Sequence, residues 1–151
     1  MSDGVSNGVR SRRPLLAIAL LGVAFVGFLP EAARSGSGTS VWDGVYTAAQ
    51  ADRGKDLYVR HCSACHTLEL AGGEMTPLAG QDFLSHWEGK SIDDLLSLVQ
   101  ETMPQDAVGT LSRQTDVDIL TFVLQSNNFP AGGVELKDSP ELKGVIVKAR
   151  K

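Results

Sequence analysis

Apolar residues recur at helical spacing in several stretches of the chain, and almost no stretch alternates with the period of two that marks a strand. The first helical stretch begins near Gln50, where Gly54, Tyr58 and Cys62 recur every four residues and share one face. A glycine inside a helix costs about 1 kcal/mol relative to alanine. Gly54 therefore predicts the close approach of another helix.

Two more helices are indicated in the middle of the chain. A short one fits residues 81–87, whose apolar residues share one face. Ser91 followed by Asp94 is typical of a capping box, in which the two side chains satisfy backbone N–H groups at a helix start. The apolar stripe that follows must stop by Met103-Pro104, because proline disfavours helical backbone in the residue before it.

The last predicted helix starts at Ser112 and ends before residues 127–130, which contain two asparagines and a proline. Asp116 and Asp118 near its start are interpreted as charges that favour a helix N-terminus, rather than as a carboxylate pair for acid–base chemistry. Four helical segments with almost no strand pattern predict an all-α domain over residues 49–129.

The segments around this domain lack helical patterning. Residues 34–48 (RSGSGTSVWDGVYTA) are rich in glycine, serine and threonine, and predict a flexible linker. Residues 71–80 (AGGEMTPLAG) predict a loop. The C-terminal tail, residues 130–151, holds one β-branched apolar run at 145–147, which we expect to pack along the surface.

The N-terminus has the pattern of an export signal. Three arginines precede an uncharged apolar run of 15 residues from Leu15 to Leu29, and small residues follow the run. We expect residues 1–33 to be a signal peptide and the mature protein to reach a bacterial periplasm or its equivalent. The candidate cleavage sites fit poorly, which leaves an uncleaved membrane anchor over residues 15–29 as the alternative.

The body of the chain is acidic. The 151 residues carry a net charge of −4, and residues 36–151 alone carry 10 basic and 16 acidic residues. This balance disfavours nucleic acid and anionic lipid as partners, because both repel an acidic surface. It is compatible with a basic docking surface on a partner protein.

The pentapeptide CSACH holds both cysteines of the chain, Cys62 and Cys65, and ends in His66. The spacing is typical of covalent haem attachment, in which both thiols add to haem vinyl groups and the histidine becomes the proximal iron ligand. The alternatives are a thioredoxin-like redox pair, half of a zinc site, or coincidence. No βαβ pattern surrounds the motif, and a zinc site would have to draw on His61 and His86. We predict one covalently bound haem c.

The second axial ligand decides between electron transfer and ligand binding. Met75, Met103, His61 and His86 are the candidates. Met75 lies only nine residues past His66, whereas Met103 ends a predicted helix and precedes a stiffening proline. A methionine at such a place is usually core, yet with haem bound we expect Met103 to be the distal ligand. His86, Met75 and an open site stay as alternatives.

Together these features resemble the class I cytochromes c over residues 49–129. The resemblance rests on CSACH, on Gly54 and Tyr58 ahead of it, on the PLAG loop at residues 77–80 and on the turn at residues 103–104. It implies a small helical domain around one haem, with its first and last helices crossing at Gly54.

The same resemblance implies two further roles beside the haem. In that family the carbonyl of a proline after the motif holds the second ring nitrogen of the proximal histidine, a role that maps to Pro77. Trp87 is expected either to border a haem propionate or to pack in the core.

A narrower resemblance runs from GQDFLSHWEGKSIDDLL through MPQDAVGTLS to NNFPAGGVEL. These strings are similar to small cytochromes that accompany PQQ-dependent alcohol and aldehyde dehydrogenases. The similarity implies a carrier that takes electrons from a quinoprotein dehydrogenase and passes them towards a terminal oxidase or another cytochrome. Alternatives are a haem-based sensor with a labile sixth ligand and a redox subunit docked permanently through the 131–151 tail. No motif positions a distal histidine or arginine, so we expect no enzymatic activity.

Overall fold

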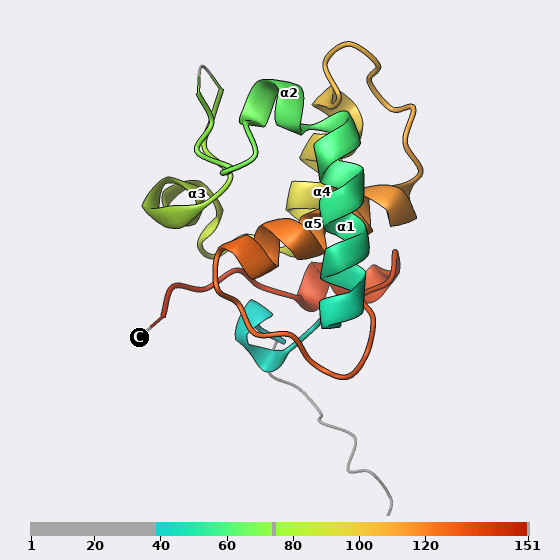
Figure 1. Cartoon of the computed structure of the whole chain (residues 1–151). Coiled ribbons are helices and arrows are strands. Elements are labelled where there is room, and N and C mark those ends of the chain that lie inside the picture. The colour runs from blue at the N-terminus through green and yellow to red at the C-terminus, as the bar shows by residue number, and fades with distance from the viewer. Residues whose placement is uncertain (1–38, 74, 151) are drawn as a thin grey trace, which may run out of the picture. The chain divides into compact units, whose positions relative to one another are not determined.

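Helices and the loops between them account for the regular structure in the described residues, 39–73 and 75–150 of this computed structural model (Figure 1). In chain order the elements are η1 (Val41–Asp43), α1 (Ala48–His61), α2 (Ser63–His66), α3 (Gly80–Trp87), α4 (Ile92–Thr102), α5 (Arg113–Ser126) and η2 (Pro140–Gly144). Within this part of the chain, β-structure is limited to two isolated bridges. The all-α fold class is therefore confirmed.

Hydroxyl side chains begin the three longest helices. Thr47 caps α1 by accepting a hydrogen bond from the Gln50 N–H, so the helix starts slightly earlier than predicted. Ser91 and Asp94 form the predicted capping box of α4, with both reciprocal hydrogen bonds present. Ser112 caps α5 as predicted. Such caps satisfy N–H groups that a helix leaves without partners in its first turn.

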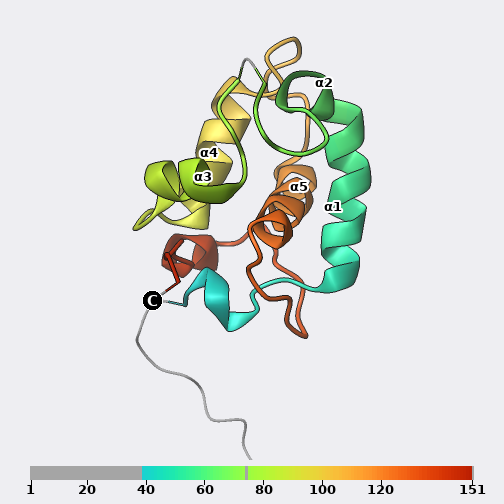
Figure 2. The same cartoon turned by 60° about the vertical axis from the view of Figure 1, so that its left-hand side comes forward.

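A glycine brings two backbones together where α1 crosses α5 (Figures 1 and 2). A Cβ atom on Gly54 would lie 1.9 Å from the carbonyl oxygen of Asp118, so only glycine fits this position. One turn further along, the rings of Tyr58 and Phe122 pack with centroids 5.2 Å apart. The close helix approach predicted from Gly54 is confirmed.

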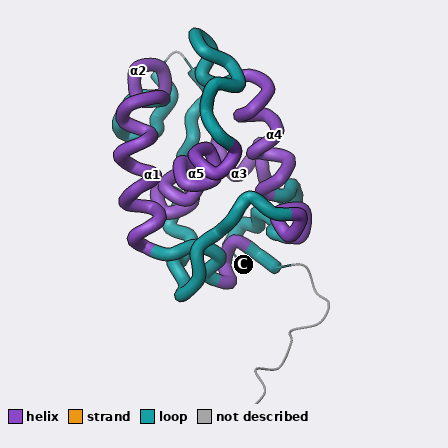
Figure 3. The backbone as a smooth tube through the Cα atoms, turned by 90° about the vertical axis from the view of Figure 1, so that its right-hand side faces the viewer, coloured by secondary structure: helices purple, strands orange, loops and turns teal. Residues whose placement is uncertain are grey.

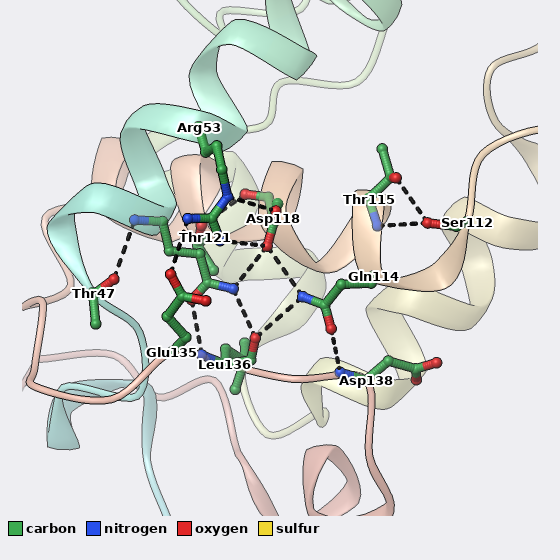
Figure 4. Close-up of polar contacts among 11 residues, drawn as sticks. Thr47, Arg53, Ser112, Gln114, Thr115, Asp118, Thr121, Glu135, Leu136 and Asp138 are labelled. Atoms are coloured by element: carbon green, nitrogen blue, oxygen red, sulfur yellow. Dashed lines mark hydrogen bonds and ion pairs between the residues drawn. The ribbon is translucent and has the colours of Figure 1, made fainter.

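A polar network joins α1, α5 and the tail on one side of this crossing (Figure 4). The fully buried Gln50 donates from Nε2 to Asp118 Oδ1 at 2.8 Å and to the Leu136 carbonyl at 2.7 Å. The Leu136 N–H returns a hydrogen bond to Gln50 Oε1 at 2.8 Å. Arg53 donates to Asp118 Oδ2 at 3.1 Å, and Gln114 to Asp118 Oδ1 at 3.1 Å.

Asp116 lies in the first turn of α5, as expected of a helix-start charge, yet both Asp116 and Asp118 are buried. Only 1% of Asp116 and 8% of Asp118 is exposed. Residues from α1 and α4 cover the start of α5, so both aspartates face protein rather than water. Both carboxyl groups hydrogen-bond to side chains from other elements.

The flexible linker predicted for residues 34–48 is wrong for its described part, residues 39–48. Val41 and Tyr46 are fully buried. The Tyr46 hydroxyl donates to the carbonyl of Phe129 at 2.6 Å, and the Phe129 ring packs edge-on against Trp42 at a centroid distance of 4.8 Å. Contacts with residues more than eighty positions away order this segment, and its composition alone does not reveal them.

The tail is mostly loop (Figure 3), yet it completes the core rather than lying along its surface. Leu142, Val145 and Val147 are buried. Ile146 forms a parallel bridge with Ser40 and an antiparallel bridge with Ser91. The tail thereby ties the first described residues to the start of α4.

The predicted signal peptide or anchor, residues 1–33, lies outside the described residues. Among the residues that are described, no helix is both long and apolar enough to cross a bilayer.

Candidate functional site

The CSACH motif follows α1 directly and forms the single turn of α2. The Cys62 N–H donates to the Tyr58 carbonyl at 2.8 Å, which continues the α1 hydrogen-bond pattern. The His66 N–H donates to the Cys62 carbonyl at 3.0 Å and closes the turn. This turn leaves Cys65 exposed, Cys62 partly buried and His66 only 9% exposed.

Tyr58 anchors the end of the motif to α1. Its hydroxyl donates to the carbonyl of Thr67 at 2.7 Å and lies 3.3 Å from the carbonyl of His66. Burial is the main cause that raises the pKa of Tyr58 to about 12, so the phenol stays a donor near neutral pH. The helix that makes the Gly54 crossing therefore also positions the motif.

The imidazole of His66 is held from the loop that follows. Its Nδ1 lies 3.2 Å from the carbonyl oxygen of Thr76. The expectation that Pro77 supplies this carbonyl is therefore wrong by one residue. Thr76 directly precedes Pro77, so the carbonyl that faces the ring belongs to the peptide bond into the proline rather than to the one after it. This contact leaves Nε2 for a ligand.

Asn127 fixes the far end of this loop, a role that the sequence pattern did not indicate. Its Nδ2 donates to the carbonyl of Leu78 at 2.9 Å, and its Oδ1 accepts from the Gly80 N–H at 2.9 Å. The sequence identified Asn127 only as a helix stop. One side chain at the end of α5 thus holds the loop between the motif and α3.

Met103 ends α4, as its position before proline predicts. Its N–H donates to the Val99 carbonyl at 2.8 Å, and its carbonyl accepts from the Gly109 N–H at 3.4 Å. The side chain is partly buried. Its role as the distal ligand stays a prediction.

The other candidates for the distal position differ in exposure. His61 and His86 are exposed, and His86 Nδ1 lies 2.8 Å from the carbonyl of Asp82 within its own helix. Met75 is partly buried in the loop after the motif.

Trp87 is partly buried at the end of α3 and packs against the core. The ammonium of Lys90 lies 4.9 Å from the centroid of its ring. The core position was one of the two expected for this tryptophan, and its relation to a haem propionate stays a prediction.

The two thiols are free, and neither belongs to a metal-ligand cluster in the described part of the chain. Burial is the main cause that raises the pKa of Cys62 to about 11. A thiol with so high a pKa is protonated at neutral pH, unlike the attacking thiolate of a redox CxxC pair. This disfavours the thioredoxin-like reading.

Residues 49–123 match the family model described as cytochrome C oxidase, cbb3-type, subunit III. The chain is a mono-haem class I c-type cytochrome. No curated protein and no solved structure matches it. The cytochrome binds one haem c covalently and performs haem-based electron transfer.

The donor set of the cytochrome fits this cofactor. Cys62 and Cys65 are both unpaired; Cys62 caps the single turn of α2 and Cys65 lies within it, which suits two thioether bonds to one haem. His66 follows at once, with one ring nitrogen already engaged by a carbonyl, which orients the ring of a metal-bound histidine.

Proposed function

We propose that this cytochrome is a periplasmic one-electron carrier with His66 and Met103 as axial ligands. The observation that carries the proposal is the carbonyl of Thr76 at 3.2 Å from His66 Nδ1. A ring held in this way keeps one tautomer and one orientation and presents Nε2 as a stronger donor. The haem supplies the one-electron chemistry, and the chain supplies the ligands and their surroundings.

Met103 completes this arrangement in the proposal. A thioether is a soft and weakly donating ligand, so it favours ferrous over ferric iron and raises the reduction potential. It also keeps oxygen and other small ligands away from the iron. We therefore expect electron exchange through the haem edge without bond-making chemistry.

We propose a quinoprotein dehydrogenase as the electron donor and a terminal oxidase or another cytochrome as the acceptor. Support for the donor is the similarity of three segments to cytochromes that accompany PQQ-dependent dehydrogenases. Support for the acceptor side is the name of the matching family model, which is that of an oxidase subunit. The 10 basic and 16 acidic residues of 36–151 favour partners with a basic docking surface.

A permanently bound redox subunit is the second candidate, and the oxidase-subunit name of the family model favours it. The tail does not serve as a free docking segment in that case, because Leu142, Val145 and Val147 are buried within the cytochrome itself. Purification of the tagged chain from its native membrane and soluble fractions distinguishes a carrier, which is recovered alone, from a subunit, which is recovered with stoichiometric partners.

The central experiment is a reduced-minus-oxidised spectrum of wild type and Met103→Ala, each with and without carbon monoxide. Both proteins are produced with a haem-attachment system. The proposal expects a low-spin six-coordinate wild type that does not bind carbon monoxide, and a variant that does. A wild type that binds carbon monoxide freely would replace the carrier with a sensor that has a labile sixth ligand. Met75→Ala is the matched control and is expected to behave as wild type.

A further inference from the structure

Gln100 joins the two ends of the loop that carries Met103. It lies in the last turns of α4, and its Nε2 donates to the Leu111 carbonyl at 3.4 Å and to Asp116 Oδ2 on α5. Residues 103–112 form the loop that connects α4 to α5, so the two contacts of Gln100 join the end of α4 to the end of this loop and to the start of α5. We call Gln100, the Leu111 carbonyl and Asp116 the clasp.

The acceptor end of the clasp is buried. Asp116 is 1% exposed, and its own N–H donates to the Ser112 carbonyl at 3.1 Å in the first turn of α5. A buried carboxyl group needs a hydrogen-bond partner, and loss of that partner costs more than loss of an exposed contact. Opening the clasp would leave a buried acceptor without its side-chain donor.

The loop itself has little else to hold it. Most of its residues between Pro104 and Leu111 are exposed, among them Val108, which is 50% exposed. Its internal backbone bonds are short-range turns, such as Ala107 N–H to the Pro104 carbonyl at 2.9 Å. Segments with few buried contacts open at low free energy unless their ends are fixed. The partly buried Leu111 and the clasp fix the ends of this one.

We propose that the clasp holds the Met103 loop closed, so that Gln100 and Asp116 are positioning residues for the distal ligand. This inference rests on the proposed function, in which Met103 is that ligand. Neither residue is an axial ligand in that proposal. The clasp sets the equilibrium between a closed loop, which presents the sulfur, and an open loop, which admits another ligand.

Competition by an external ligand measures this equilibrium. If imidazole binds the ferric protein only when Met103 is displaced, its apparent affinity is its intrinsic affinity multiplied by the open fraction. A broken clasp raises that fraction. The affinity for imidazole should rise by the same factor, while the intrinsic chemistry of the iron stays unchanged.

The test compares Gln100→Met, Asp116→Leu and Asp116→Asn as haem-loaded proteins. Gln100→Met keeps the length of the side chain and removes its donor, and Asp116→Leu removes the acceptor. Asp116→Asn keeps an oxygen that can accept the hydrogen bond from Gln100, so it should keep the wild-type affinity for imidazole that Asp116→Leu loses. The matched control is Gln114→Met, the same substitution in the polar network that binds Asp118.

We expect Gln100→Met and Asp116→Leu to bind imidazole at least ten times more tightly than wild type and to weaken the near-infrared band of methionine-ligated ferric haem. Asp116→Asn and Gln114→Met should stay within a factor of two of wild type. The double variant Gln100→Met/Asp116→Leu should match the single variants. Each single substitution already removes the same hydrogen bond, the one between Gln100 and Asp116, so the second adds nothing. Should Gln100→Met fail to take up haem, Gln100→Asn replaces it, since its amide is one methylene too short.

An imidazole affinity that stays at the wild-type value in Gln100→Met and Asp116→Leu would overturn the clasp, even if both variants unfold at a lower temperature. So would an equal rise in Gln114→Met, which would indicate general loosening. Failure of the proposed function is recognised separately, because Met103→Ala would then leave the near-infrared band and the imidazole affinity of wild type unchanged.

Discussion

Asp116 and Asp118 lie two residues apart on α5, and their surroundings shift their pKa values in opposite directions. Asp118 belongs to the network with α1 and the tail, on the side of the Gly54 crossing, whereas Asp116 belongs to the clasp with α4. Burial alone would raise the pKa of Asp118, but hydrogen bonds from Gln50, Arg53 and Gln114 outweigh it and hold that pKa below its usual value. Burial is the main influence on Asp116 and raises its pKa, with Gln100 opposing only in part.

The difference shows that burial does not by itself determine the charge of a carboxyl group. Asp118 has three side-chain donors, one of them a guanidinium, and these favour the ionised form. Asp116 has one neutral side-chain donor. Near the start of α5, the fold thus holds one well-satisfied charge that supports the helix crossing and, two residues away, a poorly satisfied carboxyl group beside the loop of the predicted distal ligand.

The largest effect is expected from Gly54→Ala, because it disrupts the crossing to which Asp118 belongs. The new methyl group would lie 1.9 Å from a backbone oxygen that cannot move alone. We expect a loss of about 3 kcal/mol or more in the free energy of unfolding, or failure to mature. Urea denaturation of the holoprotein measures it. Gly144→Ala is the control, because nothing lies within 4 Å of the Cβ atom added there. If Gly54→Ala cost as little stability as Gly144→Ala, the tight crossing would be contradicted.

Asp118→Ala should follow, with a loss of about 2–4 kcal/mol at neutral pH. One N–H of the buried Gln50 amide would lose its acceptor, and Arg53 would lose one of its two carboxylate partners. The pH dependence provides a second readout. Since the folded pKa of Asp118 is lowered, its contribution is present above the unfolded value and is lost as the pH falls through the folded one. Stability measured from neutral to acid pH should fall less steeply in the variant. Equal slopes would show that Asp118 does not carry this charge.

Asp116→Asn should have a smaller effect and the opposite sign. The folded pKa of Asp116 is raised, so protonation of this group stabilises the folded wild-type protein. This contribution to the free energy of unfolding is present below the unfolded pKa and is lost as the pH rises through the folded pKa. Removal of the charge should therefore leave stability within about 1 kcal/mol at neutral pH, and raise it slightly. The stability difference from wild type is measured from below the ordinary pKa of an aspartate up to neutral pH. A large loss at neutral pH would mean that the ionised form is the favoured one.

The smallest effect is expected at the exposed edge of the Asp118 network. Arg53 also pairs with Glu135 at 2.9 Å, and both side chains are more than 40% exposed. Glu135→Gln should cost no more than about 0.5 kcal/mol, and added salt should remove the difference. Thermal denaturation at low and high ionic strength checks this. A cost as large as that of Asp118→Ala would show that the network extends further than its buried part.

The sequence predicted those features of the fold that depend on residues close together in the chain, namely the starts and ends of the helices. The capping box at Ser91, the start of α5 at Ser112 and the end of α4 at Met103 all follow from residues within one or two turns. The close helix contact at Gly54 was predictable too, because a glycine is costly in a helix interior unless space requires it.

Features that depend on distant residues were not predictable in this way. The order in residues 39–48 comes from contacts such as Tyr46 with Phe129, which no local period reveals. The burial of Asp116 and Asp118 depends on which elements cover α5. The carbonyl at His66 comes from Thr76 because of the path of a loop, and a motif alone locates that carbonyl only to within one residue.

The bridge from Ile146 to Ser40 and Ser91 has a consequence for the order of events during synthesis. A ribosome makes the chain from its N-terminus, so the CSACH motif exists well before the residues that close this side of the core. Non-local pairing waits for the later partner. Until Ile146 has been added, Ser40 has no bridge partner, and the two thiols belong to an unfinished fold. The motif is therefore open to a haem-attachment system before this side of the core is complete.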